Sequence, residues 1–276
     1  MLLTLQPYEI FAVLWKHPEQ WQRVFLGNYS ADALAPYWET ISSSSWRSCP
    51  IKTDPDLWRD RGKVVPFFTH SDGGEVYRNH VHEVYSWSSP FSHDIDPKDA
   101  KLYIMMLEEG LQMPCVTENQ ITVYLEYQNT VLRSGKHPAK NHDGSPVTGD
   151  KVELIGKDLA GGFRACCVGW TGDLKEEVKV HNLRKNYQCN FLCKKCWGCK
   201  HKEGGNAYDF RSNAFWMANR ISHEAYLATT PPRELSPWVR MKGWTIYRNR
   251  EDDLHQIWLG FGKDSCDGVL LTKRLR

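Results

Sequence analysis

The chain lacks several features that would assign it to a common class. No uninterrupted apolar run approaches the roughly 20 residues that a membrane helix needs. The N-terminus has neither a basic start nor a small-residue cleavage site, so we expect no signal peptide and no membrane partner. There is no glycine-rich phosphate loop, no serine-nucleophile elbow and no internal repeat. No cysteine stands beside a histidine or asparagine in a recognisable protease pattern.

The composition nevertheless predicts a folded protein. Hydrophobic residues make up 41% of the 276 residues, and there are 12 Trp, 12 Tyr and 10 Phe, which is too much apolar area for a disordered chain. The net charge of +2 says little, but residues 175–202 hold eight Lys or Arg against two Glu. Such a basic segment suits a polyanion such as nucleic acid, and the alternative is a solvated lysine-rich loop.

The cysteines cluster in the same segment. Nine cysteines is an odd number, and four of them lie between Cys189 and Cys199, which indicates reduced thiols in an intracellular protein rather than a disulfide framework. The two-residue spacing of Cys193, Cys196 and Cys199, followed by His201, predicts a zinc site. Cys189 can replace either end member of this set.

One tight loop needs a distant ligand to enclose an ion, because the usual second, separated cysteine pair is missing. His181 and His223 are candidates for that position. The alternatives to a metal site are a redox pair or buried structural cysteines. Cys166 and Cys167 fall in an expected buried strand and are interpreted as packing residues. His80 and His82 alternate as strand neighbours, where surface histidines are commoner than ligands.

The periodicity predicts helices first and a sheet later. Two short helices should precede Gly27 with a break near His17-Pro18, and a third should follow a cap at Ser30. We interpret residues 42–56 as a linker. Strands are expected within residues 63–74, an apolar run that ends in a turn, and at residues 83–89, 101–110 and 163–170. A helix is expected at 116–135, starting at a Thr117/Gln120 capping box and stopping at Gly135, and a looser helical region at 206–223.

Two acids follow expected strands. Asp72 lies in THSDGG and Asp173 in GWTGD. Three meandering strands, a helix and a strand that returns beside the first describe an α/β, RNase-H-like mixed sheet, in which these acids can meet. Two such carboxylates can hold Mg²⁺ or Mn²⁺ for phosphoryl transfer. The alternative is ordinary turn chemistry, because Asp before Gly is common at strand ends.

Four segments together resemble eukaryotic cut-and-paste DNA transposases of the CACTA (Plavaka-like) and Kyakuja–Dileera–Zisupton kind. They are VVPFFTHSDGGEVYRN, VGWTGDLKEEVKVHNL, FLCKKCWGC and DDLHQIWLGFGKD, in the expected order. The resemblance implies a nuclear, DNA-binding protein that can form homo-oligomers, with Mg²⁺-dependent DNA cleavage and strand transfer as its ancestral activity. It assigns Asp72 and Asp173 as metal-binding acids.

The same resemblance implies a third acid on a helix beyond Leu259-Gly260, which we do not find in this chain, so we expect an incomplete or inactive copy. Glu224 and Glu251 are in-chain substitutes. Phosphate contacts are expected from four basic residues: Arg184, Lys185, Lys194 and Lys195.

The expected domains are a helical region and linker (1–57), the RNase-H-like core (58–180), a Cys-rich, zinc-knuckle-like insertion (181–232) and a C-terminal partial segment (233–276). The rival hypothesis is a non-enzymatic, zinc-dependent DNA- or protein-binding module.

Overall fold

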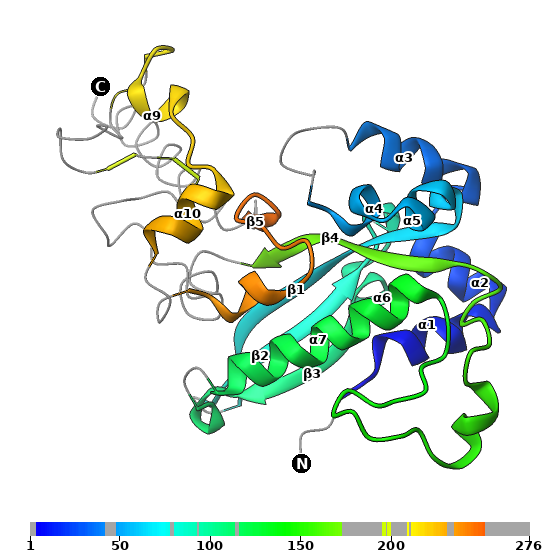
Figure 1. Cartoon of the computed structure of the whole chain (residues 1–276). Coiled ribbons are helices and arrows are strands. Elements are labelled where there is room, and N and C mark those ends of the chain that lie inside the picture. The colour runs from blue at the N-terminus through cyan, green and yellow to red at the C-terminus, as the bar shows by residue number, and fades with distance from the viewer. Residues whose placement is uncertain are drawn as a thin grey trace, which may run out of the picture. The chain divides into compact units, whose positions relative to one another are not determined.

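The structure is a computed structural model that describes residues 4–41, 48–77, 80–92, 94–113, 116–172, 195–196, 198–199, 209, 211–230 and 235–251 (Figure 1). Residues 1–170 and 236–248 form one unit, and residues 171–235 and 249–276 form a second. The first unit is a mixed sheet with flanking helices, which confirms the expected α/β class. None of the helices in the described part of the chain has the length and apolarity that crossing a membrane requires.

The sheet of the first unit is built from four strands. These are β1 (Val64–Tyr77), β2 (His80–Ser88), β3 (Leu102–Glu108) and β4 (Arg164–Gly172). β1, β2 and β3 are antiparallel neighbours along the chain, and β4 lies on the other side of β1, so that the order is β3-β2-β1-β4. The fourth strand therefore returns beside the first, as the sequence predicts.

The contacts between β1 and β4 show that the two strands run in the same direction. Asp60, just before β1, forms a 3.1 Å ion pair with Arg164 at the start of β4. Farther along both strands, the Thr69 hydroxyl lies 3.8 Å from the Cys167 sulfur. A parallel pair needs a long crossover connection, and residues 78–163, which include β2, β3 and a helix, supply it.

That helix is α7 (Val116–Ser134), which lies over one face of the sheet in Figure 1. Its buried face includes Ile121, Leu125 and Leu132 at helical spacing. Gly135 adopts a φ of 69° and ends the helix, as expected. The expected capping box is wrong, because the Thr117 hydroxyl accepts a 2.9 Å hydrogen bond from the backbone of Met113 ahead of the helix.

The N-terminal helices belong to the same unit as the sheet, a point that the sequence leaves open. α1 (Pro7–Trp15) and α2 (Pro18–Trp21) break at His17-Pro18, and a π-helical turn, η1 (Gln22–Leu26), ends at Gly27 with a φ of 58°. Rings from these helices reach the sheet, since the centroids of Phe25 and Trp87 lie 5.4 Å apart. Ser30 precedes η2 (Ala31–Ala33) and α3 (Leu34–Thr40) without a side-chain cap, so that expectation is wrong.

Part of the expected linker is helical. α4 (Pro50–Thr53) and α5 (Pro55–Arg59) each begin with proline, whose fixed φ suits the first turn of a helix. The Asp54 side chain caps α5 by accepting hydrogen bonds from the backbone of Asp56 and Leu57, at 3.0 and 3.2 Å. Ile51 and Leu57 are buried against Cys166 and other β4 residues, so this stretch forms core rather than a linker.

The remaining elements are short. In the first unit they are η4 (Arg61–Lys63), η5 (Pro90–Ser92), α6 (Pro97–Ala100), η6 (Glu109–Leu111), η7 (Gly149–Leu154) and η9 (Pro237–Arg240). In the second unit they are α9 (Phe215–Ala218), α10 (His223–Thr229) and β5 (Asn249–Glu251). The helical region expected at 206–223 is thus limited, among its described residues, to α9 and the first residue of α10.

Candidate functional site

Asp72 lies inside β1 rather than after it. Its backbone pairs with Val84 of β2, and β1 continues to Tyr77. The Asp72 side chain is half-buried, and no ion pair or side-chain hydrogen bond links it to any described residue. The prediction that Asp72 lies just past a strand is therefore wrong. The alternative, that Asp72 belongs to a turn at the end of the strand, is wrong for the same reason.

The two residues after Asp72 leave space beside the strand. Gly73 and Gly74 pair with Glu83 and His82 of β2, and a Cβ built on Gly74 would meet no atom within 4 Å. Aspartate and glycine both disfavour strands. Glycine inside a strand often marks the close approach of a ligand or another backbone. The Asp-Gly-Gly sequence is therefore unfavourable for a strand, and it leaves open space beside β1 at Gly74.

The second acid of the expected pair, Asp173, lies outside the described residues. The structure places the strand before it, because β4 ends at Gly172 and is the neighbour of β1. The convergence of Asp72 and Asp173 stays a prediction. Of the in-chain substitutes for a third acid, Glu224 is exposed in the first turn of α10, where hydrogen bonding to backbone and Ser222 lowers its pKa.

A further carboxylate near Asp72 was missed in the sequence. Glu83 is only 1% exposed and accepts a 3.4 Å hydrogen bond from the Tyr85 hydroxyl. It pairs with Gly73, so its side chain lies on the opposite face of the sheet from that of Asp72. The alternation of Glu83 with the buried Tyr85 and Trp87 is the signal that could have found it. Its position excludes it as a metal partner for Asp72.

The cysteine-rich segment is described only in part. Cys196 and Cys199 are buried, at 9% and 3% exposure, and neither is in a disulfide. Cys196 forms an antiparallel bridge with Arg220, and the Ile221 backbone donates a 3.0 Å hydrogen bond to Lys195. These contacts fix the backbone around one half of the expected cysteine set.

The other expected ligands and phosphate contacts lie outside the described residues. They are Cys189, Cys193, His201, Arg184, Lys185 and Lys194, together with the candidate distant ligand His181. Within the part of the chain that is described, no three His, Cys, Asp or Glu side chains are grouped so that they could hold a metal. His223, the other candidate distant ligand, starts α10, and burial lowers its pKa.

Three cysteines of the first unit pack in its core. Cys166 and Cys167 are buried in β4, which confirms that they are packing residues. Cys49 lies beside them, and its hydrogen bond with Cys166 lowers the pKa of the Cys49 thiol to about 6, while the same contact and burial raise the pKa of Cys166. His82, the strand histidine, is half-buried and belongs to no metal group of the described residues.

Comparison of the chain with protein-family models, with curated proteins and with solved structures finds no match. The function is therefore argued from the strand order and from the residues of the site.

Proposed function

We propose that the chain is an RNase-H-like core of the DNA-transposase kind, in which Asp72 is a ligand of a catalytic-type divalent metal ion. The strand order supports this: three antiparallel strands, a crossover helix, and a fourth strand parallel to the first and beside it. Residues 171–235 belong to the second unit, whereas residues 236–248 belong to the first unit again. This division supports an insertion that follows β4 in the chain and interrupts the core.

The observation that carries the proposal is the isolated carboxylate of Asp72 in a central strand. A half-buried acid between two neighbouring strands costs free energy unless a partner compensates it. The structure offers Asp72 no cation among the described residues and places two glycines after it. A bound Mg²⁺ or Mn²⁺ would compensate the charge, because hard divalent cations prefer carboxylate oxygens.

In this proposal Asp72 and Asp173 hold the metal together, since Asp173 follows directly on the strand beside β1. The metal would stabilise the attacking and leaving oxygens of a phosphodiester during strand cleavage. The basic residues Lys194 and Lys195, with Arg184 and Lys185, would contact DNA phosphates and contribute affinity without sequence readout. Such a protein acts on nuclear DNA.

The test measures Mn²⁺ binding by electron paramagnetic resonance in the wild type and in Asp72→Asn, which keeps shape and removes charge. Glu19→Gln, an exposed acid in α2 without a described partner, is the matched control. We expect Asp72→Asn to weaken Mn²⁺ binding by more than about tenfold, because even indirect changes to a metal site cost 10–100-fold. Glu19→Gln should bind as the wild type does.

DNA cleavage is measured in parallel with supercoiled plasmid and Mn²⁺. Any nicking by the wild type should disappear in Asp72→Asn and persist in Glu19→Gln. Equal Mn²⁺ affinity in all three proteins, or nicking that survives Asp72→Asn, contradicts the proposal.

A second candidate function, a zinc-dependent DNA- or protein-binding module, is favoured by the burial of Cys196 and Cys199 as reduced thiols. Zinc content measured by mass spectrometry should fall from one ion per chain in Cys196→Ser. It should stay unchanged in Cys49→Ser, a buried cysteine of the first unit. An ion retained in Cys196→Ser removes this candidate.

A further inference from the structure

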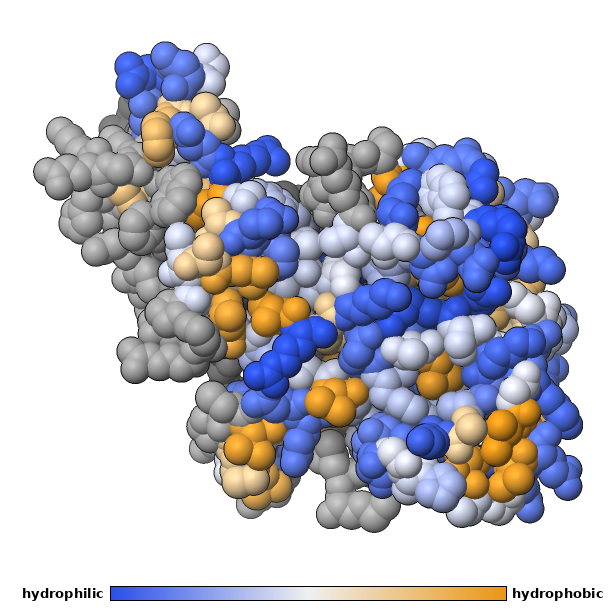
Figure 2. Space-filling view, in the orientation of Figure 1, coloured by the Kyte–Doolittle hydropathy of each residue, from blue (hydrophilic) through white to orange (hydrophobic). Residues whose placement is uncertain are grey.

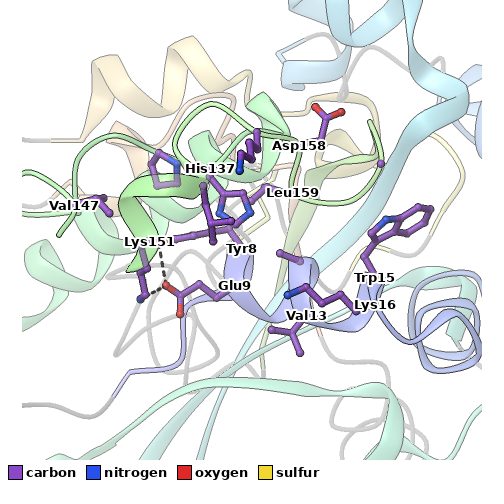
Figure 3. Close-up of a pocket in the computed structure, with 15 residues that line it drawn as sticks. Tyr8, Glu9, Val13, Trp15, Lys16, His137, Val147, Lys151, Asp158 and Leu159 are labelled. Carbon is purple, nitrogen blue, oxygen red and sulfur yellow. Dashed lines mark hydrogen bonds and ion pairs between the residues drawn. The ribbon is translucent and has the colours of Figure 1, made fainter. Parts of the chain in front are cut away.

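The first unit contains a cavity of about 400 Å³ that no part of the proposed metal site lines. Its walls come from α1, from the chain just after α7, and from the segment around η7 (Figure 3). The volume falls within the range of about 300–1,000 Å³ that is usual for small-molecule sites. The charged and aromatic residues that line it are Tyr8, Glu9, Trp15, Lys16, His137, Lys151, Lys157 and Asp158.

The indole of Trp15 forms part of one wall of the cavity. The Trp15 ring packs against Trp21 and Phe163, with centroids 5.2 and 5.4 Å away, yet remains 36% exposed. Gly161, with a φ of 58°, allows the ring to lie against its backbone, because a Cβ there would meet the indole at 2.5 Å. Trp15 is thus held in place before any ligand binds.

Among the described residues, the cavity also has more lysines than carboxylates that pair with them. Lys151 is paired with Glu9, which in turn accepts a hydrogen bond from Tyr8 at 3.2 Å. Lys16 and Lys157 form no ion pair with any described residue. Figure 3 shows Lys16 next to Trp15 at the end of α1, with Glu9 nearer the start of the helix. Two ammonium groups that have no carboxylate partner among the described residues, next to the indole of Trp15, favour an anion that carries a ring.

Backbone hydrogen bonds hold the opposite wall together. His137 donates to Lys157 at 2.9 Å, and Gly156 donates back to His137 at 3.0 Å. Leu159 is tied to Gly135 at 2.8 Å. Lys157 and His137 therefore lie on two segments that backbone hydrogen bonds hold together, so that less conformational entropy is lost when a ligand binds.

Apolar side chains also line the cavity. Val13 and Leu154 are among the lining residues and are 52% and 39% exposed. Figure 2 shows an apolar group in orange over the segment between α7 and β4, surrounded by hydrophilic residues. The apolar lining would help to exclude water from a bound ring.

We propose that the cavity binds one nucleotide, with its base stacked on Trp15 and its phosphate between Lys16 and Lys157. The nucleotide can be free or can be one unit of a single-stranded nucleic acid, since both present the same ring and phosphate. Aromatic stacking on bases tolerates any base, because each has a π-face. The proposal does not depend on the metal site at Asp72.

The ionisation of His137 is consistent with such a site. Burial lowers its pKa, Glu9 opposes this, and Lys16 and Lys157 lower it further. The other charged groups around the cavity are the Glu9–Lys151 and Lys136–Asp158 pairs. A bound phosphate would offset the positive charge of Lys16 and Lys157 and raise the pKa of His137, which NMR titration of its imidazole can follow.

The test is isothermal titration of the full chain with dAMP, deoxyadenosine, inorganic phosphate and a short single-stranded oligodeoxynucleotide. We expect dAMP or the oligonucleotide to bind, with deoxyadenosine and phosphate each weaker by more than about tenfold. Trp15→Leu and Lys157→Gln should each weaken binding by about tenfold or more. Binding of the oligonucleotide without dAMP identifies a nucleic-acid strand as the source of the nucleotide.

The matched control is Lys52→Gln, because Lys52 also lies over a tryptophan, Trp58, at 3.7 Å, but outside the cavity. Lys52→Gln should bind dAMP as the wild type does. Asp72→Asn should also bind dAMP as the wild type does, which distinguishes the nucleotide site from the proposed metal site. Absence of binding by both dAMP and the oligonucleotide overturns the proposal. Phosphate that binds as tightly as dAMP, or binding unchanged in Trp15→Leu and Lys157→Gln, also overturns it.

Discussion

Replacement of Arg248 by methionine should strongly destabilise the first unit. Arg248 is fully buried, and its guanidinium donates hydrogen bonds to the carbonyl oxygens of Val168, at 2.8 Å, Cys167 and Gly243. It also stacks on Trp170, 5.0 Å from the ring centroid. One side chain thus attaches residues 236–248 to β4.

The free energy of unfolding that Arg248→Met should lose follows from these contacts. Hydrogen bonds from a charged donor contribute about 1.5–3 kcal/mol each, but removing the guanidinium also removes its desolvation penalty. Loss of one partner from a buried charged network usually costs about 3–5 kcal/mol. In a unit of this size each kcal/mol lowers the melting temperature by about 2–4 °C, so we expect a decrease of roughly 6–20 °C.

Thermal unfolding followed by near-ultraviolet circular dichroism measures this effect, because Trp170 and Trp238 pack edge to face in the same region. The matched control is Arg240→Met, since Arg240 is exposed and bonded only to Asn119 among the contacts that the structure describes, at 2.9 Å. The control should change stability by less than about 0.5 kcal/mol. Equal melting temperatures for Arg248→Met and Arg240→Met would refute the reasoning.

Three further predictions concern caps, turns and pH. Asp54→Ala should lose about 1 kcal/mol of unfolding free energy in urea titrations, because Asp54 caps α5, whereas Ser30→Ala, without a cap bond, should not. Gly27→Ala should unfold at markedly lower temperature, since Gly27 has a φ of 58° and backbone against its Cβ position. Gly62→Ala should not, because a Cβ there would make only an ordinary contact with Ala35, at 3.9 Å. His137 has a lowered pKa in the fold, so the unfolded chain binds its proton more readily. Stability should therefore fall as pH drops below about 6.5, and less so in His137→Gln; an equal fall in both proteins contradicts this.

The sheet could be predicted because its signals are local. The apolar runs of β1 and β4 and the alternation of β2 identify strands, and Gly135 ends the helix between them. The chain order of three strands, a helix and a strand leaves few topologies, and the observed one places the last strand beside the first. The same pattern places Asp72 next to the first strand, whereas the strand continues past it to Tyr77.

The errors arise where neighbours override local preference. Asp72-Gly73-Gly74 is typical of a turn, but the ladder with β2 keeps these residues extended. Residues 50–56 are typical of a linker, yet burial of Ile51 and the cap at Asp54 make them helical. The cavity was not predicted at all, because Trp15 and Lys157 are far apart in the chain and no periodicity links them.

The most direct test of the account is a crystal of the protein soaked in Mn²⁺ and measured at the manganese absorption edge. We predict an anomalous peak about 2.0–2.6 Å from a carboxylate oxygen of Asp72, with Asp173 on the same ion. Manganese bound only elsewhere, or an Asp173 side chain remote from Asp72, would contradict the proposed metal site.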